Sequence, residues 1–367
     1  MQPIRVLQVV TVMNRGGLET MLMNYYRKLD KKQFQFDFLV HRQERGDYDD
    51  EIEQLGGRIY RMSSIRPGNY RKYFKELDEF FKNHTEYQVV HAHINENSGF
   101  VLRAAKKYGI NCRIAHSHLA DLKLDYKYPF RLYGRYYLKP NANYYYACSE
   151  QAGTWLFGAN TPNNQIKVMP NAVDLKEFQF NPIVREEIRE QLNLKDQLVI
   201  GHVGRFNPQK NHDFLIDIFN EIQKLHSNAI LLLIGEGYLF EKVKEKVKNF
   251  GLEDKVRFLG LRKDIKLLMQ AMDVFLFPSL FEGLPVVLVE AQAAGLRCIT
   301  STGVTKEANL TGDVEFIDLK VPASEWAKHV LSKNYVRKDY SDILTKKGYN
   351  SDESVKELLN FYSKFYA

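Results

Sequence analysis

The sequence predicts an α/β protein of two similar domains, each built on a largely parallel β-sheet with helices on both faces. Short apolar runs rich in β-branched residues alternate with segments of helical periodicity, as they do in parallel sheets. This alternation restarts at Gln197, after a polar junction. The chain has 367 residues, more than one hydrophobic core usually fills, and this length also favours two domains.

The first half opens with a strand, a double glycine and a helix. Arg5–Thr11 is an apolar strand pattern, and Asn14–Leu29 has the period of an amphipathic helix. Gly16 and Gly17 permit either close backbone approach to a ligand or simply a tight turn. A complete GxGxxG is missing, so a dinucleotide cofactor is not supported. Further strands are expected at Phe34–Val40, Gly57–Met62, Tyr87–His93, Cys112–His118 and Asn143–Ser149, with helices at Asn69–His84 and Gly99–Tyr108.

Histidines end two of these strands. His91 and His93 close one strand, and His116 and His118 close the next. Ligands of parallel sheets bind beyond these carboxyl ends. No Asp or Glu accompanies the histidines at ligand spacing, and we expect the HxH pairs to point to opposite faces. The sequence therefore predicts a hydrogen-bonding or polarising histidine in a cleft, and no metal site.

Cations alternate with aromatic rings between Leu119 and Pro140. This pattern favours an anionic membrane surface, where rings lie at headgroup level. A partly buried structural helix is almost as well supported, and nucleic acid less so. The cations are Lys123, Lys127, Arg131, Arg135 and Lys139.

Charge is concentrated in the first half. Met1–Pro170 holds 25 Lys and Arg against 17 Asp and Glu, whereas the remainder holds 27 against 28. Such a basic half indicates an acidic partner, either a phosphorylated acceptor or an anionic membrane, or else a solvated basic face.

Composition favours the cytosol. The three cysteines form no CxxC pair, which argues against disulfides and structural zinc and fits a reducing compartment. No apolar run approaches the roughly 18 residues that span a bilayer. Ile4–Val12 carries Arg5 and is expected to be a first strand and not a signal peptide.

A junction at Ile166–Phe180 separates the halves, and the helix Val184–Leu192 follows it. The loop after the strand in Gln197–Phe206 holds Arg205 and Lys210. Two cations at a helix start can neutralise a departing diphosphate, although a lone pair on a loop is usually solvated. Later strands are expected within Ala229–Val243, Lys255–Ser279 and Arg297–Ser301, and a final helix at Ser351–Ala367.

The stretch Phe277–Gly295 holds two carboxylates, Glu282 in a loop and Glu290 about two turns inside a helix. Unpaired N–H groups at such a helix start suit a phosphate, and neighbouring carboxylates can accept hydrogen bonds from sugar hydroxyls. Taken alone, the pair is more readily explained as a helix-start acid and a solvated face residue.

Taken together, seven motifs resemble a GT-B glycosyltransferase of the large retaining family four. They are GGLET at Gly16, HAH at His91, MPNAVD at Met169, GRFNPQKN at Gly204, IGEG at Ile234, FLG at Phe258 and FEGLPVVLVEAQAAG at Phe281. They follow the family's order from about residue 5 to 300. The segment from Thr300 resembles the bacterial capsule and exopolysaccharide branch.

The resemblance implies two Rossmann-like domains facing each other across a cleft: residues 1–172, on which the helix 351–367 packs back, and residues 173–350. It assigns Arg205 and Lys210, with backbone at Gly283 and Leu284, to the donor diphosphate. The remaining implied contacts are Glu290 with ribose, Glu282 with the transferred sugar, Leu261 and Arg262 at the base, Gly16 and Gly17 near the phosphates, and His118 near the reacting centre.

Two positions depart from the family pattern. The family's histidine is followed directly by Asp, but here Asp121 comes third after His118, so His116 is an alternative. The segment TGVTKEAN replaces a glycine-rich segment at the edge of the donor pocket.

The implied activity is transfer of a sugar, with retention and without metal or cofactor, from a nucleoside-diphosphate sugar to a glycan or lipid-linked hydroxyl. UDP is the favoured base, the setting is bacterial surface polysaccharide synthesis, and the location is cytoplasmic or peripheral at the inner plasma membrane. A nucleic-acid partner is not expected. A phosphorylase, a nucleotide-sugar epimerase and a non-catalytic assembly partner are the alternatives.

Overall fold

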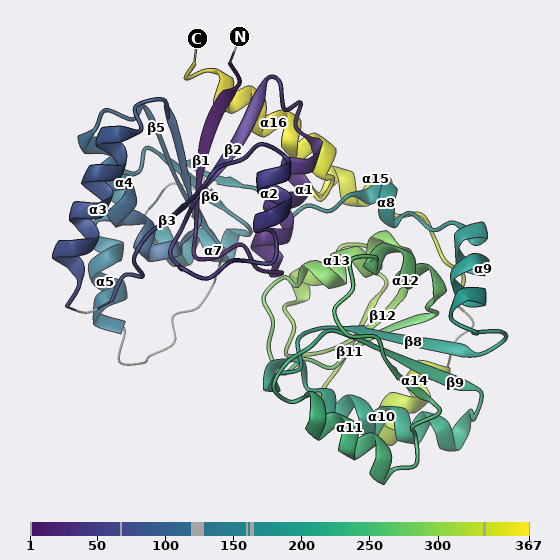
Figure 1. Ribbon diagram of the computed structural model, residues 1–367. Helices are drawn as coiled ribbons and strands as arrows, with labels where there is room; N and C mark the ends of the chain where they lie inside the picture. The colour runs from purple at the N-terminus through teal and green to yellow at the C-terminus, as the bar shows by residue number, and fades with distance from the viewer. Residues whose placement is uncertain are drawn as a thin grey trace. The chain divides into compact units, whose positions relative to one another are not determined.

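The computed structural model describes residues 2–66, 68–118, 128–158, 161, 165–332 and 335–366. The chain divides into two compact units. The first consists of Met1–Ala172 with Ser351–Ala367, and the second of Val173–Asn350. Each unit has its own parallel sheet and its own hydrophobic core (Figure 1). This architecture confirms the predicted α/β fold class.

Within the described residues, the sheet of the first unit has seven parallel strands in the order β3-β2-β1-β4-β5-β6-β7. The order reverses between β1 and β4, which makes their carboxyl ends the topological switch point where ligands bind in such sheets. The strands are β1 (Ile4–Val10), β2 (Phe34–Val40), β3 (Ile59–Arg61), β4 (Val89–Ala92), β5 (Cys112–Ser117), β6 (Tyr144–Ala147) and β7 (Ile166–Val168).

Helices cover both faces of this sheet because its strands are apolar on both sides. Val6 and Val10 point into one core and Leu7 and Val9 into the other, following the strand period of two. The first core lies under α1 (Gly17–Lys28), α2 (Asp49–Gln54) and α16 (Ser351–Ser363). The second lies under α3 (Tyr70–Asn83), α4 (Ser98–Lys107), α6 (Leu138–Asn141) and α7 (Glu150–Phe157), with η1 (Asn95–Asn97) and α5 (Tyr128–Tyr136) beside α4.

In the described part of the second unit, six parallel strands lie in the order β10-β9-β8-β11-β12-β13. The switch point here lies between β8 and β11. The strands are β8 (Leu198–Val203), β9 (Ala229–Ile234), β10 (Val256–Phe258), β11 (Val274–Phe277), β12 (Arg297–Ser301) and β13 (Val314–Ile317).

The second sheet is also covered on both faces (Figure 1). One face packs against α8 (Leu175–Phe178), α9 (Pro182–Gln191), α12 (Ile265–Ala271), α13 (Val286–Ala293) and α15 (Ser341–Lys346). The other packs against α10 (His212–Leu225), α11 (Phe240–Asn249) and α14 (Ala323–Leu331). Two short 3-10 turns, η3 (Pro208–Lys210) and η4 (Lys306–Ala308), lie in the loops after β8 and β12.

The last helix, α16, belongs to the core of the first unit. Val355, Leu358 and Tyr362 are buried there, in the same core as the buried side chains of α1. Lys28 of α1 also pairs with Asp352 of α16. Helix α16 therefore covers, together with α1, one face of the sheet of the first unit.

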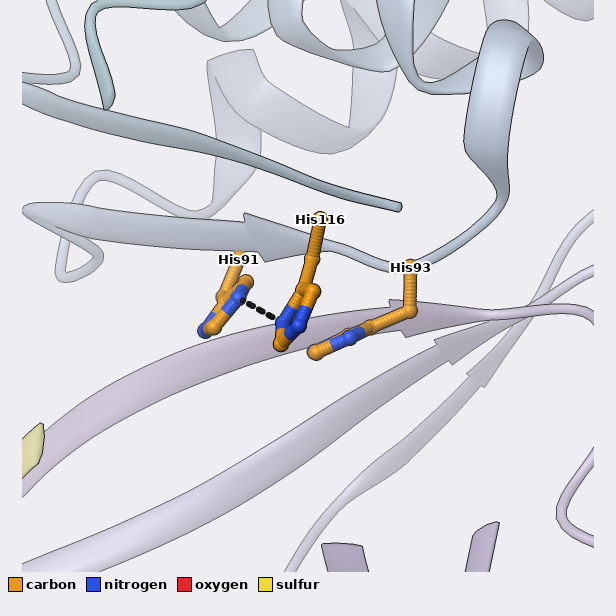
Figure 2. A group of neighbouring side chains, drawn as sticks. All are labelled: His91, His93 and His116. Carbon is orange, nitrogen blue, oxygen red and sulfur yellow. Dashed lines mark hydrogen bonds between the residues drawn. The ribbon is translucent and has the colours of Figure 1, made fainter. Parts of the chain in front are cut away.

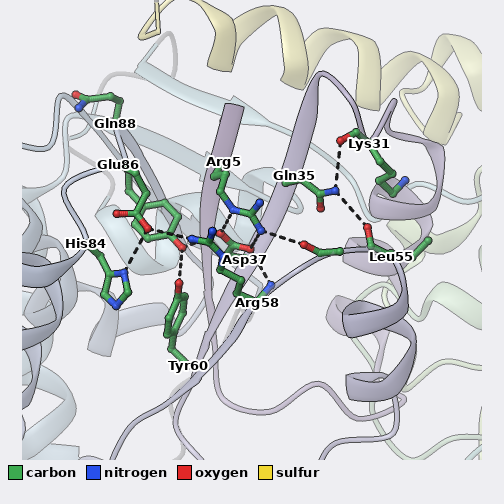
Figure 3. A network of polar contacts seen from close by, with 12 residues as sticks. Arg5, Lys31, Gln35, Asp37, Leu55, Arg58, Tyr60, His84, Glu86 and Gln88 are labelled. Atoms are coloured by element: carbon green, nitrogen blue, oxygen red, sulfur yellow. Dashed lines mark hydrogen bonds and ion pairs between the residues drawn. The ribbon is translucent and has the colours of Figure 1, made fainter. Parts of the chain in front are cut away.

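A buried carboxylate, Asp37, joins the strands at one edge of that sheet (Figure 3). Arg5 donates to both of its oxygens at 2.7 and 2.8 Å. The Tyr87 hydroxyl donates at 2.7 Å and the main-chain N–H of Arg58 at 2.8 Å. Four donors compensate the cost of burying this charge.

Some elements differ from the sequence predictions. The strand expected at Gly57–Met62 covers only Ile59–Arg61, because its start is a turn around Gly56 and Gly57. The helices α2 and α14 and the strand β13 were not predicted. The helix α13 begins at Val286, so Glu290 is its fifth residue and lies about one turn inside, not two.

Candidate functional site

The loops after β8 and β11 meet at the switch point of the second unit. Lys210 ends η3 in the first loop, and Glu282 lies in the second. The Lys210 ammonium donates to the Glu282 carboxylate at 2.6 Å. It also lies 4.5 Å from the centre of the Phe277 ring at the end of β11. The structure therefore brings together two predicted site residues that are 72 positions apart.

This ion pair is largely shielded from water. The side chain of Lys210 is 16% exposed and that of Glu282 is 11% exposed. Shielding strengthens electrostatic interactions, so an anion that reached Lys210 here would be bound more firmly than on an open surface.

The backbone holds Glu282 against the loop that follows β12. Its N–H donates to the carbonyl of Gly303 at 3.0 Å, and its carbonyl accepts from Thr305 at 3.2 Å. A Cβ at Gly303 would lie 2.1 Å from the carbonyl oxygen of Leu280, so only glycine fits there. The segment TGVTKEAN, which differs from the family pattern, therefore directly supports the loop that holds Glu282.

Arg205, the second predicted cation, follows the strand end at Gly204. Its side chain is exposed, and among the described residues its guanidinium has no recorded hydrogen bond or ion pair. It does not join the Lys210–Glu282 pair. The neighbouring loop packs so closely that a Cβ at Gly235 would lie 2.2 Å from the Gly204 carbonyl oxygen.

Open space adjoins the start of α13. Gly283 is exposed, and a Cβ there would meet no atom within 4 Å. Leu284 is half-buried, and Pro285 caps the helix. The first turn of α13 therefore leaves backbone N–H groups without intrahelical partners, close to the predicted Gly283 and Leu284 contacts.

Glu290 projects from α13 into a poorly hydrated position. Burial raises the pKa of its carboxyl to about 7. Within the described residues no side-chain hydrogen bond to this carboxyl is recorded. It can therefore both accept and donate a hydrogen bond near neutral pH.

The predicted base-side residues lie in the loop after β10. Leu261 is 52% exposed. Arg262 is also exposed, and it donates to both carboxylate oxygens of Asp264 at 2.8 and 2.6 Å. Leu261 thus offers an uncovered apolar surface, whereas the guanidinium of Arg262 is already engaged.

Two buried histidines beneath Lys210 were missed by the sequence analysis. His202 of β8 donates from Nδ1 to the Leu276 carbonyl at 2.9 Å, and His212 of α10 stacks on Phe206 at 4.0 Å. Burial lowers both pKa values, with nearby Lys210 adding to the effect, and that of His212 falls to about 4. Both rings are neutral, so they add no charge beside Lys210. Their buried positions in a strand and a helix gave no functional signal.

In the first unit, the double glycine lies at the start of α1. Gly16 is the residue before the helix and Gly17 its first residue. A Cβ at Gly16 would lie 2.4 Å from a carboxylate oxygen of Glu19. The glycine therefore makes room for an acidic side chain over the helix start.

The four histidines at the ends of β4 and β5 form one cluster. His91 and His93 stack with their ring centres 4.2 Å apart, and Figure 2 shows His116 beside them. The expectation that HxH pairs point to opposite faces is wrong, because residues two apart in a strand share a face. His118 joins the cluster through His93, with Nε2 2.9 Å from Nδ1 of His93.

His91, His93 and His116 offer ring nitrogens within 4.8 Å of one another. Three histidines could in principle ligate zinc. The donor set fits poorly, because all three rings are buried and no carboxylate or thiolate in the described part of the chain joins them to offset the ion's charge. Nitrogens of these rings are also already hydrogen-bonded to one another and to Gln8 and Tyr362.

The basic and aromatic stretch is only partly described, and Lys123 and Lys127 lie outside the described residues. On α5, Leu132, Tyr133 and Tyr136 are 42%, 42% and 76% exposed. Of the remaining predicted cations, Arg131 and Arg135 lie on α5 and Lys139 lies on α6. Arg131 lies 3.6 Å from Glu96, Arg135 is half-buried, and Lys139 is exposed. Among the described residues, no helix is both long and apolar enough to cross a membrane.

Two family models match the chain, one in each half. The model described as Glycosyltransferase Family 4 matches residues 15–177, and the model described as Glycosyl transferases group 1 matches residues 184–315. Together they cover most of the chain, in both units.

Three relatives match most of the chain. EpsF of Bacillus subtilis, which is named as a glycosyltransferase, is 38% identical over 98% of this chain and 96% of its own length. The UDP-Gal:alpha-D-GlcNAc-diphosphoundecaprenol alpha-1,3-galactosyltransferase of Escherichia coli is 26% identical over 81% of this chain and 79% of its own. The capsular polysaccharide biosynthesis glycosyltransferase CapH of Staphylococcus aureus is 25% identical over 98% of both chains.

A solved structure shares the fold. HepE of Anabaena, crystallised in complex with UDP, has a TM-score of 0.78 and 17% identity, and the match covers 98% of this chain and 100% of HepE.

Proposed function

Because the chain belongs to the GT-B glycosyltransferases of family four, we propose that it transfers a sugar from UDP to a lipid-linked or glycan hydroxyl, with retention of anomeric configuration. The similarity to CapH, which is named for capsular polysaccharide biosynthesis, supports a role in surface polysaccharide synthesis. The observation that carries the proposal is the shielded Lys210–Glu282 pair at the switch point of the second unit.

A nucleoside diphosphate suits this site on charge grounds. The Lys210 ammonium can donate to a phosphate oxygen in place of Glu282. N–H groups at the start of α13 can donate to another phosphate oxygen. Glu290 can bond ribose hydroxyls, and Leu261 can pack on the base. UDP is favoured because the E. coli relative is named for UDP-Gal and HepE was crystallised with UDP.

Departure of UDP breaks the bond between the sugar C1 and the phosphate oxygen. Lys210, and Arg205 from the same loop, stabilise the charge that grows on the leaving group, so no metal is needed for this step. Glu282, once released from Lys210, holds sugar hydroxyls. The acceptor oxygen bonds to C1 on the face that UDP leaves, and its proton passes to the departing phosphate.

His118 is proposed to contact the donor sugar from the first unit. It directly follows β5 and is half-buried, whereas the alternative His116 is buried. Gly16 and Gly17 offer the donor phosphates a backbone approach, although Glu19 first has to move aside.

The exposed face of α5 is proposed to bind the inner face of the plasma membrane. Tyr133 and Tyr136 would lie at headgroup level, with Lys139 near anionic lipid. A lipid-linked acceptor fits this placement, since the E. coli relative is named for a diphosphoundecaprenol substrate.

The test is transfer to an undecaprenyl-diphosphate sugar from a panel of UDP-, GDP- and ADP-sugars. We expect one UDP-sugar to be consumed with formation of a glycosidic product, whose anomeric configuration NMR assigns as retained. Turnover only with orthophosphate would indicate a phosphorylase, and conversion without acceptor an epimerase. Consumption of no donor at all would favour the non-catalytic assembly partner and contradict the proposal.

A further inference from the structure

A group of buried aromatic rings lies beside the ammonium of Lys210 in the second unit. Phe277 is the last residue of β11, and the centre of its buried ring lies 4.5 Å from the Lys210 nitrogen. The ring of His202 stacks on that of Phe277 at 5.5 Å, and the ring of Phe275 stacks on it at 5.7 Å. The contact with the ammonium is thus made by the ring at the end of the strand.

The sheet holds Phe277 in place. Phe277 pairs with Thr300 of β12, and its carbonyl accepts a hydrogen bond from the Thr300 hydroxyl at 2.8 Å. Strand β11 itself lies between β8 and β12. Packed cores leave buried side chains little freedom to move, so the ring of Phe277 is a fixed surface.

The main chain of Lys210 is tied to the same strand end. The N–H of Leu280 donates to the carbonyl of Gln209 at 2.8 Å, and the side-chain amide of Asn211 donates to the carbonyl of Pro278 at 3.1 Å. These two hydrogen bonds join the loop after β8 to the loop after β11, one on each side of Lys210 in the sequence. The main chain of Lys210 is therefore held near the end of β11 without help from its ion pair.

The stem of Lys210 runs close to the main chain at Gly204. A Cβ at Gly204 would lie 3.0 Å from Cγ of Lys210, 3.1 Å from its Cδ and 3.1 Å from Nε2 of His202. Burial lowers the pKa of His202, so its ring stays neutral near neutral pH. The histidine next to the stem therefore adds no positive charge that would repel the ammonium from Phe277.

The face of a phenylalanine ring attracts a cation because its π electrons carry negative charge. This attraction is strongest where water is excluded, and the side chain of Lys210 is only 16% exposed. An ammonium has three N–H donors, and Glu282 accepts from one of them at 2.6 Å. A ring face competes little with a charged acceptor for these donors. Phe277 can therefore attract the ammonium both before and after an anion takes the place of Glu282.

We propose that Phe277 is a positioning residue, which keeps the Lys210 ammonium at the switch point while its acceptor changes from the Glu282 carboxylate to an oxygen of a diphosphate. That this diphosphate belongs to a sugar donor rests on the proposed function, whereas the contact between ring and ammonium is a property of the second unit alone. A cation that is already fixed binds an anion more tightly than a mobile one, because less side-chain freedom is lost on binding.

Fluorinated phenylalanines test this attraction while leaving the shape of the core nearly unchanged. Each ring fluorine withdraws electrons from the ring face and weakens its attraction for a cation. Isothermal titration of inorganic pyrophosphate into the full chain measures the effect. We expect the affinity to fall stepwise with monofluorinated and then trifluorinated phenylalanine at position 277, by about 5-fold or more in total. An unchanged affinity across this series would overturn the proposal.

Phe275 is the matched control, because it lies two residues earlier on β11 and is buried in the same core. Phe275→Leu and Phe277→Leu each replace one buried ring, so we expect similar decreases in Tm. Only Phe277→Leu should weaken pyrophosphate binding, by about 5-fold or more. Equal losses of affinity in the two leucine variants, or equal trends with fluorine at the two positions, would show a merely structural role and refute the proposal.

A proton spectrum tests whether the ring keeps the ammonium once an anion is bound. An aromatic ring shifts protons above its face upfield, and the Hε signal of Lys210 is assigned by its absence in Lys210→Met. We expect this signal to be upfield of ordinary lysine in the wild type and in Phe275→Leu, but not in Phe277→Leu. In the wild type it should stay upfield in saturating pyrophosphate. A return to the ordinary position, or no binding of pyrophosphate at all, would overturn the proposal.

Neither measurement needs a sugar donor or an acceptor. Failure to detect sugar transfer therefore leaves both readouts intact. Sugar transfer combined with an unchanged fluorine series would refute the role of Phe277 while leaving the proposed function in place.

Discussion

Lys210 and Glu282 carry opposite charges in loops that follow different strands, and their side chains meet at 2.6 Å. Each charge therefore compensates the other. In the proposed function, an anion that binds Lys210 would release Glu282, which could then accept hydrogen bonds from sugar hydroxyls. The Lys210–Glu282 ion pair would thus couple binding of the phosphate to binding of the sugar.

The pair should also contribute to stability. Lys210→Met leaves the shielded Glu282 carboxylate without its cation, so we expect a loss of about 1–3 kcal/mol in the free energy of unfolding. Adding Glu282→Gln removes the stranded charge and should restore part of that loss. Urea denaturation of the wild type, Lys210→Met, Glu282→Gln and the double variant measures both effects, and additive losses would mean that the two residues do not interact.

Glu290 should make stability depend on pH. Burial raises the pKa of its carboxyl to about 7, so the folded state holds this proton more tightly than the unfolded chain does. The stabilisation is complete below the ordinary carboxyl pKa and is lost as pH rises through about 7. We therefore expect the Tm of the wild type minus that of Glu290→Gln to fall between about pH 5 and pH 8. Parallel curves would contradict this environment for Glu290.

At residue scale, the sequence predicted most of the candidate site residues but not their contacts. Lys210 and Glu282 were assigned to diphosphate and sugar separately, because 72 intervening positions hide their pairing. The buried pair His202 and His212 carries no sequence signal that distinguishes it from core residues.

The position of α16 in the sequence gives little indication of where this helix packs. It lies at the end of the chain and packs on α1 near the beginning, with Val355, Leu358 and Tyr362 buried. Tyr362 also bonds His91, so the helix closes both the core and the histidine cluster.

Truncating a buried side chain of α16 should therefore destabilise the first unit. Leu358→Ala removes a side chain that is 2% exposed, and we expect a loss of about 2–5 kcal/mol. Asn360→Ala, at an exposed position of the same helix, should change stability by less than about 0.5 kcal/mol. Chemical denaturation compares the two, and equal effects would argue against the packing of α16.

The buried carboxylate of Asp37 should contribute more to folding stability than an exposed carboxylate does. Asp37→Ala strands the Arg5 guanidinium and the Tyr87 hydroxyl, so we expect a loss of about 3–5 kcal/mol. Asp50→Ala removes one partner of the exposed Arg45 and should change stability much less, because water screens this ion pair. The same denaturation experiment ranks the two, and a reversed order would refute the role given to Asp37.

Strong periodicity made most strands and long helices predictable, as in Phe34–Val40, which is buried along its whole length. The short elements β13 and α14 were missed because neither has a clear apolar run. The HxH segments were correctly predicted as strand ends, but their faces were wrongly assigned. Strand geometry alone would have brought His91 and His93 together.

For the whole molecule, the sequence predicted two α/β halves because the strand pattern restarts after the junction. The structure adds that each sheet reverses its strand order once, between β1 and β4 and between β8 and β11. Candidate site residues lie at both reversals, His93 and Gly16 at one and Lys210 and Glu282 at the other. Strand order depends on long-range pairing, which local sequence patterns do not contain.

The central claim is that Lys210 binds the diphosphate of the nucleotide at the switch point of the second unit. Isothermal titration of UDP into the wild type, Lys210→Met and Lys224→Met tests it, with the exposed Lys224 of α10 as the matched lysine. Loss of one charge-assisted hydrogen bond should weaken UDP binding about 10-fold or more in Lys210→Met and leave Lys224→Met like the wild type. Equal UDP affinity for all three proteins would contradict the account.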